Sequence, residues 1–116
     1  MDASLTLRSR DALDRAYQRW RGFQERDRNE PGVDDTAPVT DGTVAALAWV
    51  LGESDSSPLL RKTGVDVSDP EHLDRERRVA TRMLHGDEAM DSRGRMYVSG
   101  VEDTLMWAVG LSDTPL

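Results

Sequence analysis

Apolar residues recur at three- and four-residue spacings near the start of the chain, and this periodicity predicts an amphipathic helix from about residue 9 to residue 26. Its apolar stripe consists of Leu13, Ala16, Tyr17, Trp20 and Phe23. The opposite face carries charged residues of both signs, which is typical of a helix that packs on one side and faces water on the other.

A second, thinner stripe follows further along the chain and consists of Leu73, Ala80, Met83 and Leu84. The start of this helix is marked in two alternative ways. Ser68 with Glu71 forms a capping box, or Asp69 caps the helix with Pro70 at its first position. Gly86 is expected to end the helix.

Two further apolar segments share the pattern G-x4-L-x-W-x2-G-x-S-D, which begins at Gly42 and again 58 positions later at Gly100. Both segments are apolar nearly all round, as buried helices are. Each ends at a glycine that can take the left-handed conformation found after a helix C-terminus. We therefore predict buried helices over residues 41–51 and 100–109.

The starts of these two helices carry signals as well. Thr40 or Asp41 can cap the first helix. Ser99 with Glu102, three residues on, forms a capping box for the second. The polar segments 27–40 and 53–58 contain proline and are interpreted as loops.

These elements predict a mainly α protein, a single small four-helix domain over residues 1–116. The repeat favours two helix–loop–helix units, 1–59 and 60–116, that share one core. The alternative is a coincidence between two helix ends. The alternating Val65 and Val67 and the extended character of residues 96–98 allow at most a short two-stranded ribbon.

Composition narrows the class of protein. The chain of 116 residues has a net charge of −7 and no cysteine, so disulfides, thiolate metal sites and cysteine nucleophiles are excluded. Direct nucleic-acid binding is not expected from an acidic chain, because phosphate contacts need cations. No apolar run approaches the ~20 residues of a membrane span and no leader peptide is evident. We therefore expect a cytoplasmic protein.

Residues capable of catalysis are sparse. The only two histidines, His72 and His85, lie 13 positions apart on one predicted helix, too far to share a metal ion. Nucleotide-binding glycine loops, nucleophile elbows and zinc-protease motifs do not occur. We therefore expect no enzyme, no cofactor and no metal. The alternative is a small enzyme or ligand-binding domain in which these histidines work with nearby carboxylates, which requires a pocket holding a histidine and a carboxylate of shifted pKa.

The function favoured by the sequence is non-enzymatic binding of another macromolecule, as an adaptor, inhibitor or accessory factor. Its partner would be another protein or a second copy of this chain. Trp49 and Trp107 each lie two positions from a leucine, roughly 200° around a helix, so each is a candidate for partner binding. Three arginines aligned on one helix are further candidates: Arg75, Arg78 and Arg82.

The aligned arginines have a simpler interpretation. Glu71 and Asp74 lie four positions before the first two of these arginines, a spacing that favours ion pairs on a solvated helix face. The excess of carboxylates also permits a different function, in which the protein mimics DNA and inhibits a nucleic-acid-binding protein.

Overall fold

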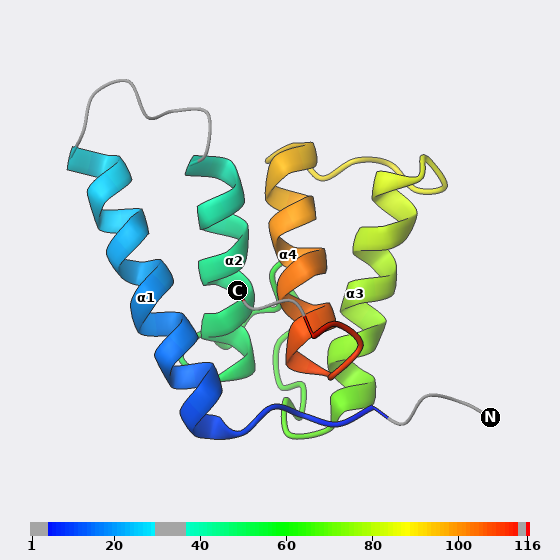
Figure 1. Cartoon of the computed structure of the whole chain (residues 1–116). Helices are drawn as coiled ribbons and strands as arrows, with labels where there is room; N and C mark the ends of the chain where they lie inside the picture. Colours follow the sequence, from blue (N-terminus) through cyan, green and yellow to red (C-terminus); the bar gives the residue numbers. More distant parts are fainter. Residues whose placement is uncertain (1–4, 30–36, 114–115) are drawn as a thin grey trace.

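Four helices account for the fold in the computed structural model, which describes residues 5–29, 37–113 and 116. They are α1 (Arg10–Asn29), α2 (Ala37–Val50), α3 (Pro70–Leu84) and α4 (Arg95–Ala108). Helices α2 and α4 lie side by side in the middle, with α1 against α2 and α3 against α4 (Figure 1). The predicted mainly α four-helix domain is confirmed. Within the described residues, no helix combines the length and apolar character needed to cross a membrane.

The core forms where the two central helices meet. Leu47 of α2 and Leu105 of α4 have no exposed surface, as predicted from their place in the repeated pattern. Leu73 of α3 is equally buried, while Leu13 of α1 is 3% exposed. The core is therefore formed mainly by α2 and α4, and each of the outer helices α1 and α3 contributes a leucine to it.

Two glycines let the backbones of α2 and α4 approach closely. A Cβ atom on Gly42 would overlap the backbone carbonyl oxygen of Tyr97, and one on Gly100 would overlap that of Val39. The two contacts are reciprocal, because Tyr97 follows Val39 by the same 58 positions that separate the glycines. Equivalent positions of the repeat thus make equivalent contacts, and duplication of a helical unit stays a prediction.

The C-terminal ends of α2 and α4 are also equivalent. Gly52 and Gly110 have φ values of 79° and 80°, the left-handed conformation predicted for both. The amide of Glu53 donates to the carbonyl of Ala48 at 2.8 Å, and the amide of Leu111 donates to that of Met106 at 2.9 Å. These bonds satisfy carbonyl groups that the last helical turn leaves without a partner.

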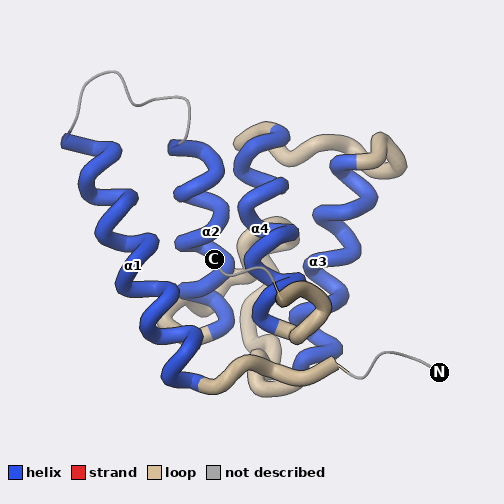
Figure 2. Tube along the Cα trace, viewed as in Figure 1, coloured by secondary structure: helices blue, strands red, loops and turns tan. Residues whose placement is uncertain are grey.

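An N-terminal extended segment covers the end of α4. The amides of Thr6 and Arg8 donate to the carbonyls of Val109 and Ala108 at 3.0 and 2.9 Å. The Arg8 guanidinium donates to the carbonyl of Trp107 at 2.8 Å and lies 5.3 Å from the centre of its indole ring. The first described residues are therefore tied to the last helix (Figure 2).

The predicted starts of α2 and α4 are wrong. Helix α2 begins at Ala37, before the expected caps Thr40 and Asp41, and its first turn contains Pro38, a position where proline is tolerated. Helix α4 begins at Arg95 after Gly94, whose φ of 94° suits glycine, so the Ser99 capping box lies inside the helix. The loop predicted over residues 27–40 is helical at both ends, and residues 30–36 lie outside the described residues.

The possible ribbon is also wrong. Residues 96–98 belong to α4, where Tyr97 and Val98 are buried against the core. Val65 and Val67 lie in the connection before α3, and no strand occurs in the part of the chain that the structure describes. Burial against α2 therefore determines the conformation of residues 96–98, against their extended preference.

The start of α3 agrees with one of its two predicted alternatives. Asp69 caps the helix, accepting a 3.0 Å hydrogen bond from the amide of Glu71, and Pro70 occupies the first helical position. Ser68 does not cap and instead donates to Asp66. Gly86, with a φ of 83°, follows the last turn as predicted.

Candidate binding site

The candidate site is a pocket of about 340 Å³ between α3 and the connection that precedes it. Side chains from α2, from the connection and from the first two turns of α3 line it: Trp49, Ser57, Leu60, Lys62, Gly64, Val65, Asp66, His72, Arg75 and Glu76. A volume near 300 Å³ is at the lower end of known ligand pockets. The pocket therefore suits one or two side chains of a partner or a small ligand.

Glu76 anchors the wall of the pocket to α3. Its side chain is buried, at 3% exposure, and one carboxylate oxygen accepts hydrogen bonds from the amides of Leu59 and Leu60 at 2.7 and 3.0 Å. Ser57 closes the same turn, because its hydroxyl oxygen accepts a 3.0 Å bond from the amide of Lys62. These bonds fix the backbone that carries Leu60 and Lys62.

The other carboxylate of the pocket is also held by its own chain. Asp66 accepts bonds from the amide and the hydroxyl of Ser68, and these bonds lower the pKa of Asp66. The backbone carbonyl of Asp66 lies 2.8 Å from Nδ1 of His72, which links the connection to α3. Both carboxylates are therefore engaged by hydrogen-bond donors within the wall.

The basic groups of the pocket are less engaged. In the part of the chain that the structure describes, neither the Lys62 ammonium nor the Arg75 guanidinium has a hydrogen-bond or ion-pair partner. The His72 ring has Nε2 3.7 Å from a carboxylate oxygen of Asp69. Leu60, which is 42% exposed, and the buried Trp49 also line the pocket. The arrangement can accept an anionic group attached to an apolar one.

The structure separates the three aligned arginines that the sequence singled out. Arg78 bonds Asp74 at 3.0 Å, as predicted, and Arg82 bonds Glu88 at 3.1 Å. The expected pair between Arg75 and Glu71 does not form, and Arg75 lies at the pocket instead. Only one of the three arginines is thus available to a ligand in this pocket.

The two candidate tryptophans differ in exposure. Trp49 is 2% exposed, so it forms part of the core and only lines the pocket. This burial agrees with the predicted helix that is apolar nearly all round, and it leaves little of Trp49 for a partner to contact. Trp107 is half-buried beneath the Arg8 guanidinium. Trp107 also lines a shallow pocket with residues of α1, so its role in partner binding stays a prediction.

The two histidines are not brought together. His72 lies in the pocket near the start of α3, whereas His85 is exposed at the opposite end, where it caps the helix. Among the described residues, no three histidine or carboxylate side chains are grouped as a metal site would require. Leu60 and Lys62 also line the pocket but were not predicted as site residues. They lie beside α3 because of the path that the connection takes, and this path is not apparent from the sequence.

Replacing Glu76 by Ala is expected to free residues 59 and 60 from α3. Two amide groups lose their acceptor, so the free energy of unfolding should fall by about 1–3 kcal/mol. Urea denaturation measures this loss, and hydrogen exchange of the two amides locates it. Glu76→Gln keeps an acceptor oxygen and should lose less; equal losses in both variants would show that the acceptor does not hold the turn.

The structure thus defines a four-helix domain with a small pocket beside α3, lined by side chains of both charges. No protein-family model, curated protein or solved structure matches the chain significantly.

Proposed function

We propose that the protein acts without catalysis, by binding an acidic segment of another protein in the pocket between α3 and residues 57–66. The observation that carries this proposal is a pair of basic groups, Lys62 and Arg75, that have no partner among the described residues and lie beside an apolar surface. A carboxylate of the partner would lie between them, and an apolar neighbour would cover Leu60. The pocket is proposed for one or two side chains of that segment.

Arginine and lysine contribute differently to such binding. The planar Arg75 guanidinium can donate two parallel hydrogen bonds to one carboxylate, whereas the Lys62 ammonium acts as a compact charge. Apolar contact beside a charged anchor excludes water and strengthens the electrostatic attraction. Because the whole chain has a net charge of −7, this basic site would also restrict where an acidic partner can approach.

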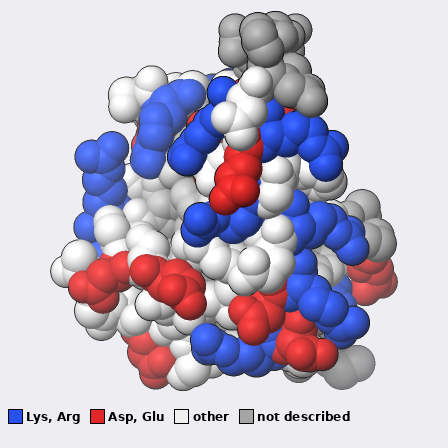
Figure 3. Space-filling view, turned by 90° about the vertical axis from the view of Figure 1, so that its left-hand side faces the viewer, with Lys and Arg blue, Asp and Glu red and all other residues white. Residues whose placement is uncertain are grey.

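The acidic-mimic alternative receives less support from the surface. Several carboxylates that could imitate phosphates are engaged internally: Asp74 with Arg77 and Arg78, Asp91 with Arg93, and Glu76 with backbone amides. On the side of α1, acidic and basic side chains are interspersed rather than segregated (Figure 3). A DNA mimic instead needs a continuous acidic face.

The enzyme alternative also receives less support. The pocket does hold His72 and a carboxylate with a shifted pKa, that of Asp66. The shift is downward and its main cause is hydrogen bonding to Ser68, so the carboxylate stays ionised near neutral pH. Such a group is a poor proton donor at that pH. These features favour binding over acid–base chemistry.

The test is a selection of displayed random peptides on the wild-type protein. We expect enriched peptides to carry Asp or Glu next to an apolar residue. The double variant Lys62→Glu/Arg75→Glu should bind them on the order of 100-fold more weakly, since two charged hydrogen-bonding groups are lost. Isothermal titration calorimetry measures the affinities, and binding should weaken as salt is added.

A charge-matched control separates the pocket from the overall charge. Arg28→Glu/Arg95→Glu changes two exposed arginines outside the pocket and gives the same net charge, since −7 minus 4 is −11 in both double variants. We expect this control to bind as the wild type does. Peptides without carboxylates, or equal weakening in both variants, would refute the proposal. Sedimentation of the wild-type chain tests whether a second copy is the partner.

A further inference from the structure

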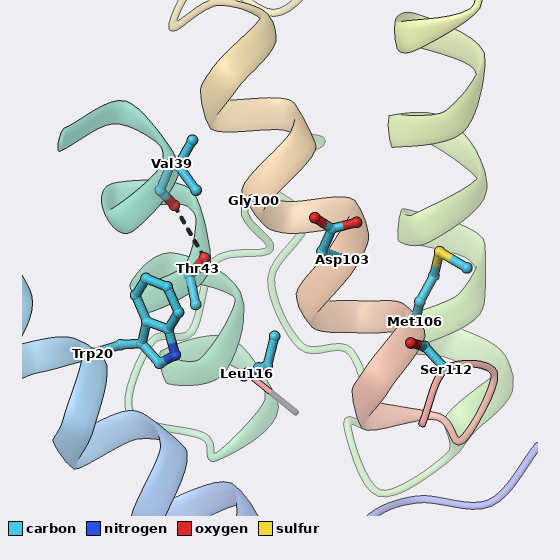
Figure 4. Close-up of a pocket in the computed structure, with 8 residues that line it drawn as sticks. All are labelled: Trp20, Val39, Thr43, Gly100, Asp103, Met106, Ser112 and Leu116. Carbon is cyan, nitrogen blue, oxygen red and sulfur yellow. Dashed lines mark hydrogen bonds between the residues drawn. The ribbon is translucent and has the colours of Figure 1, made fainter. Parts of the chain in front are cut away.

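A second pocket lies on the other side of the central helix pair and shares no residue with the first. It has a volume of about 320 Å³ and is bounded by α1, α2, α4 and the C-terminal segment (Figure 4). Trp20 of α1 forms one wall, Val39 and Thr43 of α2 lie between, and Asp103 and Met106 of α4 form the facing wall. Two polar groups of this pocket have no partner among the described residues.

The first group is the indole N–H of Trp20. It is buried and has no hydrogen-bond partner in the part of the chain that the structure describes. The ring is held edge-on against Phe23, with 5.3 Å between the ring centres. In Figure 4 its nitrogen lies on the side of the ring that faces Leu116 and α4. A buried donor without an acceptor is costly, and such groups are rare in folded proteins.

The second group is the carboxylate of Asp103. No ion pair or hydrogen bond engages it among the described residues. Asp103 is exposed at the mouth of the pocket, and desolvation by the neighbouring protein atoms is the main cause that raises its pKa, with Glu102 contributing. Glu102 itself accepts a 2.6 Å bond from the hydroxyl of Thr81 on α3, so it is engaged on the other flank of α4. Asp103 is thus a carboxylate without a cation at the pocket.

Among the described residues, neither group is a partner of the other. The other polar groups of the wall are already engaged: the main-chain oxygens of Ser112 and Leu116 accept bonds from Arg8 and Arg19 at 2.7 and 2.8 Å. The hydroxyl of Thr43 donates to the carbonyl of Val39 at 3.0 Å and is therefore already used as a donor. Val39, Met106 and Leu116 supply the apolar part of the wall. A bound molecule would need an acceptor at one end, a donor or cation at the other, and a short apolar body.

We infer that this pocket binds a small organic cation that also carries a hydrogen-bond acceptor. Its ammonium group would pair with Asp103, and its acceptor would receive the N–H of Trp20. The indole of Trp20 adds a face on which a cation or its methylene groups can pack. This inference concerns a different site from the acidic-segment pocket and does not depend on it.

The test uses a series of ω-amino amides, from glycinamide to 6-aminohexanamide, added to the ¹⁵N-labelled protein. Each member has an ammonium and a carbonyl at a different separation, so the series measures the distance that the pocket accepts. We expect saturable shifts of the Trp20 indole N–H and the Gly100 amide for one or two lengths. Alkylamines without the carbonyl and ω-hydroxy amides without the charge should each bind on the order of tenfold more weakly.

Variants separate the two contacts. Asp103→Asn should lower the affinity for the best-binding amino amide on the order of tenfold. The amino amide should then bind this variant no more tightly than the hydroxy amide does. The amino amide should bind Trp20→Phe no more tightly than the alkylamine does, because the indole donor for its carbonyl is lost. Glu25→Gln removes one carboxylate from the exposed face of α1 and should change nothing. Thermal denaturation of each variant shows that it is folded before its binding is compared.

Three results would overturn the inference. One is the absence of saturable shifts at the Trp20 and Gly100 signals for every member of the series. Another is binding that Asp103→Asn and Trp20→Phe leave unchanged. The third is an indole N–H that contacts only bound water and does not respond to any probe.

Discussion

Gly42→Ala is expected to destabilise the domain by about 3 kcal/mol, the upper part of the range for overpacked cores. The added Cβ would overlap the backbone carbonyl oxygen of Tyr97, and a backbone atom cannot rotate away as a side chain can. Helices α2 and α4 would have to separate along their contact. Gly100→Ala should have a similar effect, because its Cβ would overlap the equivalent carbonyl of Val39.

Guanidinium denaturation of each variant measures this loss. Gly22→Ala is the matched control, because Gly22 lies within α1 and its added Cβ would meet no atom within 4 Å. There the substitution should stabilise the protein by roughly 0.5–1 kcal/mol, since alanine favours a helix interior more than glycine does. If Gly42→Ala were as stable as Gly22→Ala, the close approach of the two backbones would be wrong.

Leu47→Ala and Leu105→Ala should each lower the free energy of unfolding by about 2–5 kcal/mol. Both side chains are fully buried, so each truncation loses apolar contact and leaves a cavity between the central helices. The two losses should be of similar size, because the leucines occupy equivalent positions in the repeat. Chemical denaturation with a common slope for all variants measures them.

Met96→Ala serves as the control for these truncations. Met96 is also on a central helix but is 44% exposed, so its loss should stay within about 0.5 kcal/mol. A Leu47→Ala variant with unchanged stability would contradict the burial of α2. Unequal losses at Leu47 and Leu105 would show that the equivalent positions of the repeat are packed differently.

Helix ends were predictable from the sequence where one residue type meets a specific backbone requirement. The glycines after α2, α3 and α4 all adopt positive φ, a conformation that a Cβ atom disfavours. The starts of the helices were less predictable, because several residue types can cap a helix N-terminus. Asp69 before α3 had proline as a second signal, whereas the actual start of α4 follows Gly94, which provides no side-chain cap.

The candidate sites were only partly predictable. Arg75 was named as a candidate from its place on the helix, and its binding role stays a prediction. Its expected ion pair with Glu71 was wrong, because helical spacing permits a pair without requiring one. Leu60 and Lys62 could not be assigned to the same site, since the path of the connection depends on the buried Glu76. Trp20 was assigned to the apolar stripe, and the sequence does not show whether a buried indole nitrogen finds an acceptor.

The reciprocal contact of α2 and α4 also affects how the chain can fold. Its two halves are separated by 58 positions, with α3 between them, so it is a long-range contact rather than a local helical hairpin. Contacts of high sequence separation slow folding relative to bundles built from neighbouring helices. During synthesis, the face of α2 that packs against α4 cannot be buried until α4 has left the ribosome. Until then it is exposed to other chains, and aggregation competes with folding.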